Sequence, residues 1–133
     1  MMRRSLLFAF CLSGCMSVAD IEKLPATRSG QLSGNYIDVA SCISDALADA
    51  VPVLLTVDQA TQTAVLTSVY RNDFVKMPMY VMTLTQQGEG SMEAKLQSRT
   101  TVFGTPHADT VHAWEIAETC GGGTHAVRSP TQR

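Results

Sequence analysis

Residues 77–102 read MPMYVMTLTQQGEGSMEAKLQSRTTV, and this stretch decides the fold. In its second half, apolar residues from Met92 onward alternate with polar ones that include Glu93 and Lys95. A period of two is typical of a β-strand with one face in the core and the other in water. The glycine-rich segment 87–90 separates this strand from a first half rich in Val, Met and Thr. The stretch therefore predicts two neighbouring strands joined by a tight turn.

Two further strands are predicted upstream of this pair. Residues 53–57 and 63–70 are rich in Val, Leu and Thr, and the polar segment 58–61 can turn the chain between them. Residues 71–73 supply a second turn. Consecutive strands with short links form an antiparallel meander, so four strands are expected in one antiparallel sheet.

A helix is predicted on each side of these strands. Asn35 can cap the first helix, whose apolar residues recur at spacings of three and four until Pro52 ends it. Asp109 or Thr110 can cap the second helix, and Cys120 is expected in its final turn. A sheet with one solvent-facing side must cover the other side, and two helices suffice. The predicted fold is therefore α+β, with a four-stranded antiparallel sheet covered on one face by an N-terminal and a C-terminal helix (α-β-β-β-β-α).

The N-terminus has the layout of a secretory signal peptide. Arg3 and Arg4 form a positive segment, the run 6–12 is apolar, and small residues follow it. A membrane-spanning helix needs about 20 apolar residues, so this run is too short to span a bilayer. Residues 1–14 are therefore expected to direct the chain to a membrane and to be removed.

The last residues of this region, Leu12-Ser13-Gly14-Cys15, resemble the lipobox of bacterial lipoproteins. The resemblance covers residues 1–15 only. It implies diacylation of the Cys15 thiol, cleavage before Cys15 and acylation of the new amino group, so that acyl chains such as palmitate make the lipid bilayer a partner. By resemblance to lipoprotein sorting in enteric bacteria, Met16 after the lipidated cysteine implies the outer membrane. The alternative is an ordinary signal peptide with an unmodified cysteine at position 15.

The folded part of the 133-residue chain is expected to be one domain, since a chain of this length rarely forms two. It spans residues 35–120. Residues 15–34 contain proline, glycine and serine with little periodicity, which predicts a flexible tether of about 25 Å in root-mean-square length. Residues 121–133 begin with three glycines and predict a flexible tail.

Cys42 and Cys120 are predicted to form a disulfide. Of the four cysteines, Cys11 leaves with the signal peptide and Cys15 carries lipid, so an even pair remains in an oxidising compartment. The bond would join the two predicted helices and would support the small core of the domain. Two free thiols or a metal pair are the alternatives, although two cysteines without a neighbouring Cys/His set make a poor zinc site.

The charge and the motif content argue against several classes of function. Ten basic and twelve acidic residues give a net charge of −2, so the chain has no basic surface for nucleic acid. No Gly-x-Ser-x-Gly elbow and no His-Glu-x-x-His pair occurs, and His107, His112 and His125 show no spacing typical of metal ligands. We therefore predict no catalytic residues, no resident metal and no cofactor.

A cluster of methionines leaves copper handling open as an alternative. Met77, Met79 and Met82 lie close together in the sequence, and thioethers suit Cu(I). On a regular strand, however, Met77 and Met79 share one face and Met82 points to the other. Methionine is more often a core residue or an adaptable contact.

These observations favour a lipid-anchored, non-catalytic binding or assembly module of the bacterial envelope, with an envelope protein as its partner. An uncovered sheet face or an edge strand can dock such a partner, and the sequence pattern leaves open which edge is free. One alternative is a periplasmic inhibitor or immunity protein against a cell-wall hydrolase or a toxin, since an acidic body would attract a basic target. The other is a copper-handling protein or a small hydrolase.

Overall fold

The structure is a computed structural model that describes residues 17–49, 53–71, 76–99, 104–105 and 107–122. Three helices and five strands lie within these residues. In chain order they are α1 (Val18–Glu22), β1 (Arg28–Ser33), α2 (Tyr36–Leu47), β2 (Val53–Asp58), β3 (Thr63–Arg71), β4 (Lys76–Gly88), β5 (Ser91–Ser98) and α3 (Ala108–Cys120).

The strands form one sheet in the order β1-β5-β4-β3-β2, and every neighbouring pair is antiparallel. The predicted α+β class is confirmed, and β2 to β5 form the predicted meander. The prediction of four strands is wrong, because β1 adds a fifth strand beside β5. The segment of β1, RSGQLS, has a single large apolar residue, Leu32, and therefore shows no strand pattern of its own. Pairing with β5 holds this segment as a strand, although its own sequence does not predict one.

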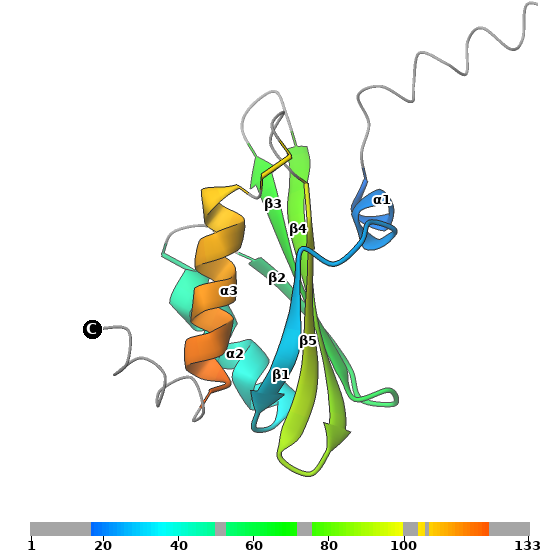
Figure 1. Ribbon diagram of the computed structural model, residues 1–133, viewed down its shortest axis with the longest axis vertical. Coiled ribbons are helices and arrows are strands. Elements are labelled where there is room, and N and C mark those ends of the chain that lie inside the picture. The colour runs from blue at the N-terminus through cyan, green and yellow to red at the C-terminus, as the bar shows by residue number, and fades with distance from the viewer. Residues whose placement is uncertain (1–16, 50–52, 72–75, 100–103, 106, 123–133) are drawn as a thin grey trace, which may run out of the picture.

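Both α2 and α3 lie on the same side of the sheet, which we call the covered face (Figure 1). The predicted cap of α2 is present, since Asn35 Oδ1 accepts hydrogen bonds from the N–H groups of Ile37 and Asp38 at 2.9 and 3.4 Å. The two helices and every second residue of β3, β4 and β5 enclose the main apolar core. Its fully buried members include Ala40, Ile43, Ala64, Leu66, Met82, Leu84, Met92, Ala94, Leu96, Ala113 and Ala117.

The predicted disulfide is confirmed. Cys42 of α2 and Cys120 of α3 are bonded, with 5.8 Å between their Cα atoms. The bond therefore fixes the two covering helices to each other. None of the helices in the described part of the chain combines the length and the apolar character needed to cross a membrane.

The opposite side of the sheet, which we call the open face, carries α1 (Figure 1). The stretch 15–34 was expected to be a flexible tether, but α1 packs on β4 and β5 through Ile21, which is completely buried, as is Val81 of β4. Gln97 of β5 donates from Nε2 to the carbonyl oxygens of Glu22 and Leu24, at 2.7 Å each. The alternating pattern placed Gln97 on the solvent-facing side, yet it is buried because α1 covers it.

Local hydrogen bonds define the start of α1. Ser17 Oγ accepts from the Asp20 N–H at 3.3 Å, and the Ser17 N–H donates to Asp20 Oδ2 at 2.9 Å. This reciprocal pair is a capping box. The hydrogen bond from the Ser17 backbone lowers the pKa of the Asp20 carboxyl below its usual value.

Candidate functional site

The strand order leaves β1 at one edge of the sheet and β2 at the other. The Gly34 N–H donates to the Gly90 carbonyl at 2.9 Å, just beyond the end of the β1–β5 pairing. In an antiparallel ladder, residues whose backbone N–H and C=O groups point toward the neighbouring strand alternate with residues whose groups point away from it. Leu32 and Gly30 therefore also bond to β5. The backbone N–H and C=O groups of the intervening residues point away from the sheet.

Two of these outward residues have free backbone groups. The third, Ser33, donates its N–H to the carbonyl of Gly121 at the end of α3. Among the residues that the structure describes, nothing bonds to the outward N–H and C=O of Ser29 and Gln31. Both residues are exposed, so this part of β1 can accept another strand.

A groove of about 580 Å³ runs between this edge and α3, and we call it the β1–α3 groove. Trp114 of α3 lies over β1 at Gly30, where a Cβ atom would be 3.6 Å from its ring atom Cζ2. This is an ordinary van der Waals distance, so the indole lies against β1 at this position. The lining residues are Arg28, Ser29, Gly30, Gln31, Leu32, Val111, Trp114, Glu115 and Glu118.

The lining of the groove includes both apolar and charged side chains. Trp114 is half-buried and so offers part of its ring to a ligand, and Val111 lies one helical turn before it. Arg28 supplies a positive charge from β1, and Glu115 an exposed negative charge from α3. This arrangement suits an extended peptide with an apolar side chain over Trp114, rather than a small molecule enclosed on all sides.

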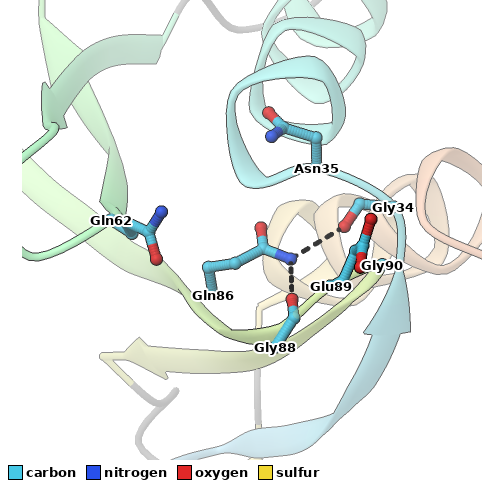
Figure 2. Close-up of a pocket in the computed structure, with 7 residues that line it drawn as sticks. All are labelled: Gly34, Asn35, Gln62, Gln86, Gly88, Glu89 and Gly90. Carbon is cyan, nitrogen blue, oxygen red and sulfur yellow. Dashed lines mark hydrogen bonds between the residues drawn. The ribbon is translucent and has the colours of Figure 1, made fainter.

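A second hollow, of about 590 Å³, lies beside the start of α2 and the turn between β4 and β5 (Figure 2). Gln86 projects into it, and its Nε2 donates to the carbonyls of Gly34, Gly88 and Ser91 at 3.2, 2.7 and 2.8 Å. Its Oε1 accepts from the Tyr36 N–H at 2.8 Å. The amide therefore has partners for all its polar atoms, and it connects the turn to the first helical residue of α2. We assign this hollow a structural role.

Tyr80 lies on the covered face of β4, opposite Ser68 of β3. Burial raises the pKa of Tyr80 to about 12, and the negative charge of Asp109 at the start of α3 adds to this effect. The hydroxyls of Ser68 and Thr110 are buried without a hydrogen-bond partner among the described residues. These groups form a polar part of the covered face near the N-terminus of α3, and they offer no accessible nucleophile.

The residues considered for chemistry in the sequence do not come together. The prediction that Asp109 or Thr110 caps the last helix is wrong, because His107 is the N-cap residue of α3, without a side-chain cap bond. His112 is exposed on the same helix. Cys15 and His125 lie outside the described residues. The described part of the chain contains no group of three His, Cys, Asp or Glu residues that could hold a metal ion.

The methionine cluster is arranged differently from the regular strand that was expected. The register of β3 and β4 shifts after Ser68, so that Met79 has no partner across the ladder. This bulge changes the direction of the side chains, and Met79 packs against the same core that contains Met82. The expectation that these residues face opposite sides is therefore wrong. Both side chains pack in or against the apolar core.

The sequence pattern missed the residues that form the groove. Trp114 lies within the predicted last helix, but no local pattern indicated that it is half-buried and lines the β1–α3 groove. Ser29 and Gln31 lay in the segment expected to be a tether. The only signal available was Gly30, whose contact with Trp114 could not be inferred from a stretch with no strand pattern.

Comparison of the chain with protein-family models, with curated proteins and with solved structures finds no match.

Proposed function

We propose that the chain is a lipid-anchored, non-catalytic binding module of the bacterial envelope, and that it binds an extended segment of a partner protein along β1. The observation that carries this proposal is the row of free backbone groups at Ser29 and Gln31 beside Trp114. A strand added at a sheet edge gains affinity from main-chain hydrogen bonds and specificity from the pockets that receive alternate side chains. The β1 edge offers both.

The groove also defines the kind of segment that fits. Side chains of an added strand alternate between the two faces of the sheet, so every second one would lie on the α3 side. An apolar or aromatic side chain there would contact Trp114, and a basic one would lie near the exposed carboxylate of Glu115. The net charge of −2 favours a basic partner through steering. The same surface would serve an inhibitor or immunity protein whose target is a basic hydrolase or toxin.

The anchor follows from the lipobox-like residues that end at Cys15. Replacement of this thiol by Cys15→Ala should move the chain from the membrane fraction to the soluble fraction and leave the thermal unfolding midpoint unchanged. A chain that stays in the membrane fraction after this substitution would contradict the lipid anchor.

The binding surface is tested by cross-linking in intact cells. A photo-reactive amino acid at Gln31 should give one dominant adduct with a partner protein, whose mass spectrum identifies it. The matched control replaces Gln59, which is also exposed but lies in the turn after β2. Adducts of the same protein and the same yield at both positions would exclude β1 as the docking edge.

A pair of substitutions then separates strand addition from side-chain contact. Gln31→Pro removes an outward N–H that the fold does not use, and proline is tolerated at such edge positions. Gln31→Ala keeps the N–H. With the photo-reactive amino acid moved to the exposed Ser29, the proline variant should lose the adduct while the alanine variant retains it, and both should unfold at nearly the same temperature. A proline variant that is folded and still binds the partner fully would contradict binding by strand addition.

A further inference from the structure

We infer that the α1 end of the sheet lies directly against the lipid bilayer, and that α1 and the residues that follow it form a membrane-contacting surface. This inference rests on the proposed lipid anchor at Cys15. The inference adds that the anchor holds the folded domain in contact with the membrane. The alternative is a domain held away from the membrane by a flexible tether.

The first argument is the length of chain between the anchor and the fold. Met16 alone separates Cys15 from Ser17, the capping residue of α1. Two successive Cα steps of about 3.8 Å span at most about 8 Å. The tether of about 25 Å expected for a flexible segment is therefore absent, because the fold begins where the tether was predicted to start.

The second argument is that α1 is held on the sheet. Ile21 is completely buried against β4, and the Gln97 amide holds the carbonyl groups of Glu22 and Leu24 at the end of the helix. Gln97 is itself 4% exposed, so these bonds are shielded from water. The connection to the anchor cannot lengthen unless α1 leaves the open face.

The third argument is the chemistry of the surface around α1. Ala19, Pro25 and Ala26 are exposed, and none of them carries a charge. Glu22 and Lys23 are also exposed and have opposite charges, and the ionised Asp20 adds one negative charge to the helix. Small apolar side chains with only one net negative charge can contact the headgroup region of a zwitterionic bilayer, where the charged groups stay hydrated.

The orientation that results places the β1–α3 groove beside the membrane. β1 follows α1 and begins at Arg28, so the Arg28 end of the groove lies nearest to the bilayer. The turn between β4 and β5 lies at the other end of the sheet from α1 (Figure 1). Glu89 in that turn is eight residues along the chain from Val81, which corresponds to about 26 Å of extended strand.

Fluorescence quenching at two positions tests this orientation. The lipidated chain is placed in phosphatidylcholine vesicles that carry a quencher on a fraction of their headgroups. A fluorophore is attached through Ala19→Cys in one sample and through Glu89→Cys in the other, both at exposed positions. The native disulfide pair stays oxidised and does not react. The Ala19 label should be quenched several-fold more strongly than the Glu89 label.

A matched control introduces a flexible tether between the anchor at Cys15 and the start of α1. Insertion of a 20-residue Gly-Ser segment between Met16 and Ser17 allows a reach of about 25 Å, and quenching at Ala19 should fall to the level seen at Glu89. Equal quenching at both positions in the native chain, with the protein still bound to the vesicles, would overturn the inference and leave the anchor intact. Vesicle binding that is absent, or that persists after Cys15→Ala, would overturn the anchor and this inference together.

Discussion

On β3, Leu66 is completely buried beneath the helices, whereas its neighbour Thr67 is half-buried on the open face. The same contrast holds on β5, where Ala94 is buried and Lys95 is partly exposed. The covered face is closed by two helices that a disulfide joins. Among the described residues, the one helix on the open face is the short α1. The covered face therefore supplies most of the stability. The open face and the β1 edge are left for the proposed contacts with the membrane and with a partner segment.

Of the changes that compare the covered face with the open face, Leu66→Ala should lower the free energy of unfolding the most. The substitution leaves a cavity in the main core, and we expect the free energy of unfolding to fall by about 2–5 kcal/mol. The control, Thr67→Ala on the open face of the same strand, should change it by less than about 1 kcal/mol. Urea unfolding of both variants measures the difference. Equal losses would show that the two faces contribute alike.

The disulfide belongs to the covered face and should have the next largest effect. The double substitution Cys42→Ser and Cys120→Ser is expected to lower the free energy of unfolding by about 2–4 kcal/mol, since the unfolded chain gains conformational freedom. Calorimetry of the variant against the native chain gives the change. Free thiols in protein isolated from its native compartment would show that the bond does not form there.

A smaller and more local effect is expected on the open face from Gln97→Leu. This change leaves two carbonyl groups of the α1 end without partners, at a cost of about 1–3 kcal/mol. Amide hydrogen exchange should rise in residues 21–24 far more than in α2. Gln87→Leu is the control, because the Gln87 amide makes an exposed bond to Glu93. Unchanged exchange in α1 would mean that Gln97 does not hold this helix.

The smallest of these effects is expected at high pH, on the covered face. The pKa of Tyr80 is raised to about 12 by burial, so the folded protein keeps the phenol proton after the unfolded chain has lost it. The stability that Tyr80 contributes is therefore complete below about pH 10 and declines as the pH rises toward 12. Urea unfolding at pH 9 to 12 should show a steeper decline in the native chain than in Tyr80→Phe. Parallel curves for the two proteins would contradict a raised pKa.

The parts of the fold that could be predicted from the sequence are those with strong local patterns. The alternation after Met92 identified β5, and the Asn35 cap identified the start of α2. Cys42 and Cys120 are the even pair that remains if Cys11 is removed and Cys15 is lipidated as expected, and this predicted their bond. Each of these signals acts between residues close in sequence or follows from cysteine chemistry, so one sequence suffices to find it.

The candidate site could not be predicted because its residues have no pattern of their own. β1 has one large apolar residue, and its order comes from hydrogen bonds to β5, some sixty residues further along the chain. Trp114 showed only helical spacing, and nothing local indicated that it would lie over Gly30. Gln97 likewise alternated as an exposed residue until α1 covered it.

The sequence by itself determined the α+β class, four of the strands, the two covering helices and the disulfide, because periodicity and capping act over a few residues. It also carried the lipobox-like segment on which the proposed anchor depends. Only the tertiary structure decided the strand order, the free edge at Ser29 and Gln31, and the position of α1 on the open face. These features depend on contacts between segments far apart in the chain, whose energies come from burial and pairing and leave no local signature.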